Sequence, residues 1–420
     1  MKGCGIAFLL PHFRPSGGVK IYLAIATELA RRGYPIVLAA CEPDGALRAN
    51  VPSTIEIVDL PASSTWRARL APLRLEWRSA LPFLPPVILE PKLHPALLRV
   101  DALANFLASH APYSLYPGGP HENAAAWLAK RLSGAGTRLV FSEHNTLSRE
   151  HTYGRGRHRL ALPPMVRLTY ATADAVVAVS SALADHVAAH HGLPRSTIQV
   201  IYNPAVPDDL ARRAAVPLDH PWFAPGAPPV VLGAGRLTTA KDFATLVRAF
   251  ALVRKQRDAR LIIIGCAKTE KKTVKRHAEL TALARQLGIT DDIALPGFTA
   301  NPYAYMARAA VFALSSRQEG LPTVLIEALA CGCPCVATDC PSGPSEILDQ
   351  GRYGRLVPVG DATAMADAIV QTLDAPPDRA HLEAAAERFA IGPAIDAYET
   401  LLAPSIPSRD PNLVSSGCPA

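Results

Sequence analysis

Two glutamates, Glu319 and Glu327, stand eight positions apart in the segment EGLPTVLIEALACG, residues 319–332. Carboxylates accept hydrogen bonds from hydroxyl groups. Glu327 comes five residues after Pro322, which is roughly 7.5 Å farther along a helix axis at about 1.5 Å per residue. The spacing therefore predicts two hydroxyl-binding carboxylates separated by the start of a helix. The alternative is that each glutamate is an ordinary solvated carboxylate on a helix.

The helix between these glutamates should begin at Pro322, because proline suits the first helical position, where its missing N–H has no partner. Gly320 and Leu321 break the strand that precedes it. The unpaired N–H groups around Thr323 and Val324, with the positive end of the helix dipole, form an anion site. A ligand with a diphosphate in its middle and a sugar at each end fits this arrangement, and a nucleotide sugar has that form.

A second pair of residues supplies the positive charge that a diphosphate needs. Arg236 follows the apolar run PVVLGAG, and Lys241 comes five residues later, just before a helix opened by Asp242. An arginine fork and a lysine point charge are natural partners for a diphosphate leaving group. The alternative is that both are ordinary basic residues of a loop.

Short apolar runs alternate with helix-like segments in both halves of the chain, which predicts an α/β fold with parallel sheets covered on both faces. Each half should form one Rossmann-like domain. The expected strands of the first half are residues 5–10, 34–40, 54–60, 137–144, 174–180 and 197–203, with helices over 22–32 and 123–132. Those of the second half are residues 229–235, 259–265, 292–297, 310–316, 334–338 and 354–359, with a helix over 243–256.

The boundary between the domains should lie within residues 204–229, where prolines accumulate and the periodicity is lost. We expect an N-terminal domain over 1–204 and a C-terminal domain over 205–402, with the final helix packing back on the N-terminal domain. The tail, 403–420, has turn formers and no periodic face, so we expect disorder there. Open parallel sheets bind ligands beyond the carboxyl ends of their strands, so the two domains should face a central cleft.

Composition places the chain among reduced, cytosolic proteins. Its hydrophobic share is 49%, yet no run reaches transmembrane length and no secretory signal stands at the start. The eight cysteines lack metal-site spacing. The motif CGCPC, residues 331–335, falls where a helix ends and a buried strand begins, which favours small apolar residues over a metal or redox role.

The net charge of +7 belongs to the first half of the chain, because residues 1–205 carry 21 Lys and Arg against 13 Asp and Glu, whereas the rest carries 22 against 23. The segment 66–99 mixes two tryptophans and many leucines with basic residues: Trp66, Trp77, Arg67, Arg69, Arg74, Arg78, Lys92 and Arg99. This mixture is typical of a segment on an anionic membrane or near a lipid diphosphate. The alternative is a helical hairpin that packs on the sheet with its arginines in solvent.

The motifs together resemble one family. Residues 235–250 (GRLTTAKDFATLVRAF), 297–298 (GF) and 319–348 (EGLPTVLIEALACGCPCVATDCPSGPSEIL) resemble the retaining, nucleotide-sugar-dependent glycosyltransferases of the GT-B fold known as family 4. The E-x7-E segment is the most specific mark. Supporting segments are 17–39, FSEHNT at 141–146, 174–183 and 200–204. The resemblance extends over nearly the whole chain, except residues 62–100 and the tail.

The resemblance implies roles for the C-terminal residues. Arg236 and Lys241 would hold the diphosphate, Glu327 the ribose hydroxyls and Glu319 the hydroxyls of the donor sugar. Gly320 and Leu321 would add backbone N–H contacts, and Gly297 and Phe298 would lie by the base. In the N-terminal domain, Gly18 would lie near the phosphates and His144 against the sugar ring. The alternative for His144 is a polar loop residue.

The resemblance also implies a retaining transfer in which Glu319 positions the sugar and no carboxylate attacks the anomeric carbon. The chain contains no Asp-x-Asp motif, so neither a metal nor another cofactor is expected. Residues 340–348 (CPSGPSEIL) resemble members that use UDP-sugars and extend polyprenyl-diphosphate-linked glycans. We therefore expect a hexose or N-acetylhexosamine to be moved to a glycan or lipid-linked glycan, on the inner face of the membrane.

The chain departs from the family pattern at Cys266 and Ala267, which replace a glycine-rich turn. Two other functions stay open. A GT-B nucleotide-sugar epimerase would share the fold but should lack the E-x7-E segment. A basic nucleic-acid-binding protein would use the arginines of the first half, but these alternate with prolines and form no recognisable readout module, so no nucleic-acid partner is expected.

Overall fold

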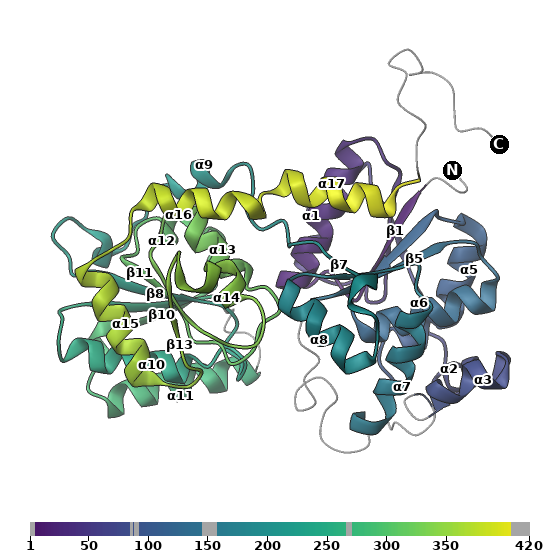
Figure 1. The fold of residues 1–420 in the computed structure, drawn as a ribbon, viewed down its shortest axis with the longest axis horizontal. Coiled ribbons are helices and arrows are strands. Elements are labelled where there is room, and N and C mark those ends of the chain that lie inside the picture. The colour runs from purple at the N-terminus through teal and green to yellow at the C-terminus, as the bar shows by residue number, and fades with distance from the viewer. Residues whose placement is uncertain (1–4, 85–86, 88–91, 145–157, 266–270, 405–420) are drawn as a thin grey trace, which may run out of the picture. The chain divides into compact units, whose positions relative to one another are not determined.

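The computed structural model describes residues 5–84, 87, 92–144, 158–265 and 271–404 (Figure 1). The chain divides into two compact units, and each is described here by itself. The N-terminal unit comprises residues 1–204 and 394–420, and the C-terminal unit comprises residues 205–393. The expected disorder from residue 405 onward and the departure at Cys266 and Ala267 fall outside the described residues.

The N-terminal unit is built on a seven-stranded sheet of order β3-β2-β1-β4-β5-β6-β7, in which every pairing is parallel. Its strands are β1 (Ile6–Leu10), β2 (Ile36–Ala40), β3 (Glu56–Asp59), β4 (Ser114–Pro117), β5 (Arg138–Glu143), β6 (Ala175–Ala178) and β7 (Ile198–Val200). Its helices are α1 (Gly17–Arg31), α2 (Thr65–Leu70), α3 (Trp77–Ala80), α5 (Val100–His110), α6 (Pro120–Ser133), α7 (His158–Ala171), α8 (Ser181–His191) and most of α17 (Ile391–Leu402).

The C-terminal unit contains a six-stranded parallel sheet of order β10-β9-β8-β11-β12-β13. Its strands are β8 (Val230–Ala234), β9 (Arg260–Ile264), β10 (Ile293–Gly297), β11 (Val311–Leu314), β12 (Cys335–Thr338) and β13 (Arg355–Val357). Its helices are α9 (Leu210–Ala214), α10 (Phe243–Arg254), α11 (Lys271–Gln286), α12 (Tyr303–Met306), α13 (Thr323–Ala330), α14 (Pro344–Ile347), α15 (Ala362–Asp374) and α16 (Arg379–Ala386).

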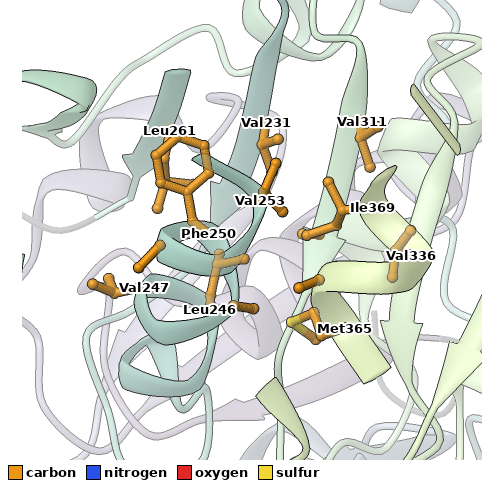
Figure 2. Close-up of a cluster of buried hydrophobic side chains, with 14 of the residues drawn as sticks. Val231, Leu246, Val247, Phe250, Val253, Leu261, Val311, Val336, Met365 and Ile369 are labelled. Carbon is orange, nitrogen blue, oxygen red and sulfur yellow. The ribbon is translucent and has the colours of Figure 1, made fainter. Parts of the chain in front are cut away.

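The continuous apolar strands predicted from the sequence pack between helices, as they must when both faces of a sheet are covered. Figure 2 shows one such layer of the C-terminal unit, where α10 and α15 lie against the sheet. Leu246 and Phe250 of α10 and Ile369 of α15 are fully buried there. Both units therefore have Rossmann-like architecture, as the sequence predicts.

The order of the strands fixes where a ligand site can form. In each parallel sheet the order of the strands reverses at one point. This point lies between β1 and β4 in the N-terminal unit and between β8 and β11 in the C-terminal unit. The loops after those strands diverge to opposite faces and leave a crevice at the carboxyl edge. The loops at 235–242 and 315–322, which carry the predicted diphosphate and sugar residues, follow β8 and β11.

The last helix contacts the first sheet of its own unit. The Tyr116 hydroxyl donates to the Tyr398 hydroxyl at 3.1 Å, and the Ser114 hydroxyl donates to the carbonyl of Leu402 at 2.6 Å. Arg32 of the loop after α1 forms ion pairs with Asp396 and Glu399. These contacts explain why residues from 394 onward belong to the N-terminal unit.

Two elements differ from the sequence expectation. The central strand β4 has the sequence SLYP, which is short, contains a serine and ends in proline, so it does not stand out as an apolar run. The region expected to be a linker contains α9, whose Leu210 is buried. In the described part of the chain, no helix is both long and apolar enough to span a bilayer.

Candidate active site

The two loops at the reversal point of the C-terminal sheet meet in an ion pair. The Lys241 ammonium, in the loop after β8, lies 2.5 Å from Oε1 of Glu319, in the loop after β11. Both side chains are largely shielded, with 19% and 10% of their surface exposed. The structure thus joins two residues, 78 positions apart in the chain, that the sequence assigns to different parts of one ligand.

Glu319 is held in place by more than Lys241. The Ser316 hydroxyl donates to the same Oε1 at 2.5 Å, and the Ser342 hydroxyl donates to the Glu319 carbonyl at 2.6 Å. Ser316 is itself fixed, because Thr338 at the end of β12 donates to its carbonyl at 2.5 Å. The carboxylate is therefore oriented before any ligand binds. The sequence analysis did not single out these hydroxyl residues, although Ser316 ends the predicted strand just before Glu319.

A second ion pair ties the same two loops together. Arg317 donates through Nε to Oδ2 of Asp242 at 2.7 Å, and its backbone N–H donates to the carbonyl of Ala240 at 2.7 Å. Asp242 adopts a left-handed conformation, with φ 43°, just before α10. Arg236 differs from these residues, because it is exposed and none of the described residues forms an ion pair with its guanidinium.

The start of α13 has the character of an anion site. Pro322 is its N-cap, no side chain caps it, and no acidic residue lies in its first turn. Thr323 and Val324 are partly exposed, and Gly320 and Leu321 are buried. N–H groups at such a helix end favour a negative charge.

The turn before α13 is held by one glycine. Gly343 has φ +91°, and a Cβ there would lie 2.6 Å from Cδ of Pro322 and 2.9 Å from the carbonyl oxygen of Gly320. A side chain at position 343 would therefore force the turn out of place. The loop after β12 thus fixes the turn that carries Gly320 and Leu321.

Glycines end three neighbouring strands of the C-terminal sheet. Gly235 donates to the carbonyl of Ile264 at 2.9 Å, and Gly265 donates to the carbonyl of Gly297 at 2.8 Å. A Cβ at Gly265, where φ is +123°, would lie 2.8 Å from the Gly235 backbone. These residues form a flat backbone edge beside Lys241, whose side chain passes Gly235. Phe298 follows this edge with 57% of its surface exposed, so its ring is free to contact a planar group.

Glu327 lies on a partly exposed face of α13. The Tyr303 hydroxyl donates to its Oε1 at 3.5 Å, the long limit of a hydrogen bond. The Arg213 guanidinium stacks over the Tyr303 ring at 4.3 Å. Burial, together with the Glu327 charge, raises the pKa of Tyr303. The sequence analysis singled out neither residue: Arg213 lies on α9, in the segment expected to be a linker, and Tyr303 begins the short helix α12.

Gly18 lies in the first turn of α1, at the reversal point of the N-terminal sheet. The Ser16 hydroxyl caps this helix by accepting from the Val19 N–H at 3.3 Å. Gly17 and Gly18 are exposed, and a Cβ on either would meet nothing within 4 Å. Neither the packing nor the backbone requires glycine here, so the open space in front of the helix start is what a closely approaching ligand would use.

His144 follows β5 directly and is neutral near pH 7. Neither ring nitrogen is exposed, although the residue as a whole is only partly buried. Burial lowers the pKa of His144 to about 4, against a smaller opposite effect of Asn203. Its ring lies 5.4 Å from that of Tyr22, whose hydroxyl contacts Ser142 at 2.5 Å and donates to the carbonyl of Pro117 at 2.8 Å.

A buried carboxyl group stands next to His144. Glu143, at the end of β5, is 2% exposed, and burial together with the nearby charge of Glu122 raises its pKa well above the usual range. The Tyr170 hydroxyl donates to its Oε1. Asn123 donates to that hydroxyl at 2.8 Å. Glu143, Tyr170 and Asn123 thus form a buried hydrogen-bonded chain behind His144.

The cysteines of CGCPC are buried free thiols. Burial raises the pKa of Cys331 and of Cys333 to about 12, so both are protonated at neutral pH. Within the described ranges, no three His, Cys, Asp or Glu side chains are grouped as metal ligands would be. Independence from metal stays a prediction.

The structure brings Lys241, Glu319, Gly320 and Leu321 together in the C-terminal unit, with Gly297 along the adjoining backbone edge. Glu327 lies farther along α13, which begins at this site. Gly18 and His144 belong to the other unit. The site is a pair of preorganised loops with a helix N-terminus, suited to a ligand that has both negative charge and hydroxyl groups.

Comparison with family models gives two matches. Residues 15–209 match the model described as Glycosyltransferase Family 4, and residues 228–375 match the model described as Glycosyl transferases group 1. The two matches together span both units and include Gly18, His144, Lys241 and Glu319.

Two curated relatives are informative. The N-acetylgalactosamine-N,N'-diacetylbacillosaminyl-diphospho-undecaprenol 4-alpha-N-acetylgalactosaminyltransferase of Campylobacter jejuni is 31% identical over 240 residues, which are 57% of this chain and 61% of that protein. The N-acetyl-alpha-D-glucosaminyl L-malate synthase of Bacillus anthracis is 27% identical over 270 residues, 63% of this chain and 64% of that protein. Each alignment spans less than two thirds of the relative's length.

Solved structures share the fold over almost the whole chain. A glycosyltransferase from Rickettsia africae superposes with a TM-score of 0.73 at 15% identity, covering 95% of this chain and 98% of that one. The Anabaena protein Alr3699/HepE, solved with UDP and glucose, gives a TM-score of 0.71 at 21% identity and covers 95% and 99%. At these identities the likeness establishes the fold.

Proposed function

Because the chain belongs to the family 4 glycosyltransferases of the GT-B fold, we propose that it is a retaining glycosyltransferase. It moves a hexose or N-acetylhexosamine from a UDP-sugar to a glycan or a polyprenyl-diphosphate-linked glycan. The observation that carries this proposal is the shielded Lys241–Glu319 pair beside the uncapped start of α13.

The charges at this pair suggest how the donor is bound. Lys241 shares its charge with Glu319, so exposed Arg236 and the N-terminus of α13 add the further positive charge that a diphosphate needs. Glu319 accepts hydrogen bonds from the sugar, and Glu327 from the ribose. Phe298 and the backbone edge at Gly297 receive the base.

The transfer breaks the bond between the anomeric carbon and the diphosphate oxygen. The acceptor oxygen forms its bond to the anomeric carbon on the same face, and its proton passes to the departing diphosphate. Lys241, Arg236 and the α13 N-terminus stabilise the charge that develops on the leaving group, which is preorganised electrostatic catalysis. Glu319 orients the sugar, and His144 is the N-terminal residue proposed to lie against the sugar ring. No metal ion takes part in this scheme.

The acceptor is proposed by likeness. The name of the Campylobacter relative specifies a diphospho-undecaprenol substrate, and the segment 340–348 supports the same class here. A lipid-linked acceptor would place the enzyme at the cytoplasmic face of a membrane.

The test is binding followed by transfer. A panel of UDP-, GDP- and ADP-sugars is added to the purified chain, and the unfolding temperature is measured, because a ligand at about 100 times its Kd stabilises the native state by about 2.7 kcal/mol. The best donor is then incubated with a polyprenyl-diphosphate glycan, with and without EDTA, and the anomeric configuration of the product is read by NMR. An inverted linkage contradicts the retaining mechanism, and loss of activity in EDTA contradicts metal independence.

The same experiment separates the second candidate function. An epimerase would convert the nucleotide sugar or release UDP with no acceptor present and would leave an added acceptor unchanged. Sugar incorporation that depends on the acceptor excludes it.

A further inference from the structure

The large apolar side chains that face solvent are concentrated in one short segment. Among the described residues, half of the strongly exposed large hydrophobic side chains lie between positions 66 and 81, and Trp66 and Trp77 are 61% and 64% exposed. We call this set the exposed stripe; it consists of Trp66, Leu70, Leu73, Trp77 and Leu81.

The stripe follows helical spacing. Its members are separated by four, three, four and four positions, and they lie on α2, on α3 and on the 3-10 turns Ala71–Arg74 and Leu81–Phe83. Residues three or four apart share a helix face. Figure 1 shows α2 and α3 at the margin of the N-terminal unit. Trp66, Leu70 and Leu73 therefore share one face, and Trp77 and Leu81 share another, because the extended residues Leu75 and Glu76 separate the two helical pieces.

The inner face of the same segment has the opposite composition. Ala68, Ala71 and Ala80 are buried, together with Phe83. A segment that folds only to cover a core turns its large side chains inward and its small ones outward. Here most of the large apolar side chains face solvent and the alanines are buried, Phe83 excepted. The stripe is therefore arranged for contact with something outside the chain.

The stripe is flanked by two exposed arginines. The Arg67 guanidinium lies 5.4 Å from the Trp66 ring, and that of Arg78 lies 5.2 Å from the Trp77 ring. Among the described residues, no carboxylate forms an ion pair with either guanidinium. Both retain a full charge for an outside partner.

The other two arginines of the segment serve the fold. Arg69 donates through Nη1 to the carbonyl of Val87 at 3.0 Å, and Arg74 pairs with Asp101 at 2.6 Å. The sequence analysis grouped these four arginines with Lys92 and Arg99. Of the four, the structure leaves Arg67 and Arg78 for an outside partner.

We infer that the exposed stripe, with Arg67 and Arg78, is a docking surface for an anionic lipid bilayer. Tryptophans suit the bilayer interface, leucines enter the acyl boundary, and arginines attract acidic headgroups. A second copy of the chain fits less well, because a symmetric contact through the stripe would bring Arg67 and Arg78 against the same arginines. The inference does not depend on which sugar the protein transfers.

The surface is tested by flotation of the full chain with vesicles of phosphatidylcholine, alone or with about a third of phosphatidylglycerol. Binding is expected only to the anionic vesicles and should fall as salt rises. Replacing Trp66→Ser and Trp77→Ser together should weaken binding by roughly tenfold or more. Replacing Arg67→Gln and Arg78→Gln together should weaken it by about thirtyfold at low salt and reduce its salt dependence.

Matched controls carry equal changes elsewhere on the surface. Val216→Ser with Val274→Ser removes two exposed apolar side chains, and Arg248→Gln with Arg285→Gln removes two exposed charges, all in the C-terminal unit. Both control pairs should bind vesicles as the unaltered chain does. A decrease equal to that of the stripe variants would show a non-specific effect and overturn the inference.

Two further outcomes would also overturn it. One is unchanged vesicle binding in both stripe variants. The other is a dimer that depends on Trp66 and Trp77, seen by sedimentation without vesicle binding, which would assign the stripe to a second copy. Sugar transfer to a soluble acceptor is measured in parallel, and the stripe variants should keep it. Failure of docking is thus distinguishable from failure of the proposed reaction.

Discussion

The two units share a scaffold but differ in the partners that surround a buried carboxyl group at the carboxyl edge of the sheet. Both sheets are parallel, and the order of the strands reverses at one point in each, between β1 and β4 and between β8 and β11. At that edge the C-terminal unit presents ion-paired residues, Lys241 with Glu319 and Arg317 with Asp242. At the corresponding edge of the N-terminal unit, Arg14 pairs with Glu42, and burial lowers the pKa of His144 and raises that of Glu143.

Two buried carboxyl groups show what sets the difference. Glu319 has the Lys241 ammonium at 2.5 Å. Glu143 has the Tyr170 hydroxyl and the nearby charge of Glu122, and its pKa is raised well above the usual range. Burial disfavours a charge unless a counter-ion compensates it. The same scaffold therefore holds one buried carboxyl group beside a lysine counter-ion and the other beside a hydroxyl group.

This contrast suggests a division of labour. A diphosphate that leaves with growing negative charge needs positive groups, such as Lys241 at the carboxyl edge of the C-terminal sheet. An acceptor hydroxyl and a sugar ring need hydrogen-bonding groups that do not compete for protons, such as the neutral imidazole of His144 and the Tyr22 hydroxyl, whose pKa is raised by burial.

Removing the lysine should have the largest effect. Lys241→Ala should lower kcat by about 10² to 10³, because it deletes one stabiliser of the leaving diphosphate. It should also destabilise the chain by about 1 to 3 kcal/mol, because Glu319 is left shielded and without its counter-ion. Steady-state kinetics and thermal unfolding measure the two effects.

The control for this variant is an ion pair of the other unit. Lys130→Ala breaks a more exposed pair with Asp174, at 3.1 Å, and should leave kcat unchanged. The double variant Lys241→Ala with Glu319→Ala should recover part of the lost stability. Near-normal activity in Lys241→Ala would remove it from the diphosphate site.

The two glutamates should separate turnover from nucleotide binding. Glu319→Ala should lower kcat by about 10², because the donor sugar loses its positioning group. Its affinity for free UDP should be unchanged or higher, because Lys241 loses its internal partner and is released for the phosphates. Glu327→Ala should instead weaken UDP binding by roughly tenfold, because the ribose is common to UDP and the donor.

Calorimetry with UDP and kinetics with the full donor test both variants. Glu279→Ala, at an exposed position of α11, is the matched glutamate control and should keep both properties. Equal loss of UDP affinity in the Glu319 and Glu327 variants would contradict the assigned roles.

A change of His144 tests the role of the N-terminal unit in turnover. His144→Ala should lower kcat by about 10 to 10² with no change in UDP affinity, because the imidazole contributes to positioning only. Since the pKa of His144 is lowered to about 4, the pH profile of the unaltered enzyme should show no His144 titration between pH 5 and 8. A transition near pH 6.5 that is absent from His144→Gln would show that the imidazole becomes charged during turnover.

The sequence predicted the architecture because its main signals are local. Continuous apolar strands, and a helix that begins at Pro322 and ends near Cys331, are readable from spacing alone. The central strand β4 was missed because its position in the sheet depends on pairing with β1 and β5, and not on the four residues SLYP.

The site residues were recognised by motif, and the pairing between them required the fold. Nothing in the spacing of Lys241 and Glu319, 78 positions apart, reveals that they form an ion pair. Ser316 and Ser342 act through hydroxyl groups, which are common in loops and carry little signal. The segment of the exposed stripe shows the same limit, since only their contacts with Val87 and Asp101 separate Arg69 and Arg74 from Arg67 and Arg78.

The smallest predicted effect concerns the free energy of unfolding and comes from a buried histidine outside the site. His191 ends α8 and is 1% exposed, and neither ring nitrogen has a hydrogen-bond partner among the described residues. Burial, followed by the nearby charges of His190, His186 and Arg167, lowers its pKa to about 3. In the unfolded chain its pKa is about 6.5.

The unfolded state therefore binds more protons than the folded state between pH 6.5 and 3, so this contribution to stability is present above pH 6.5 and is lost as the pH falls. At about 1.4 kcal/mol per pH unit, His191 should cost the chain about 1 to 2 kcal/mol between pH 6.5 and pH 5. In His191→Phe this pH-dependent part should vanish, whereas His381→Phe, at an exposed position, should keep it. Urea unfolding at pH 7 and pH 5 measures the difference. An equal acid loss in the unaltered chain and in His191→Phe would mean that His191 accepts its proton without unfolding.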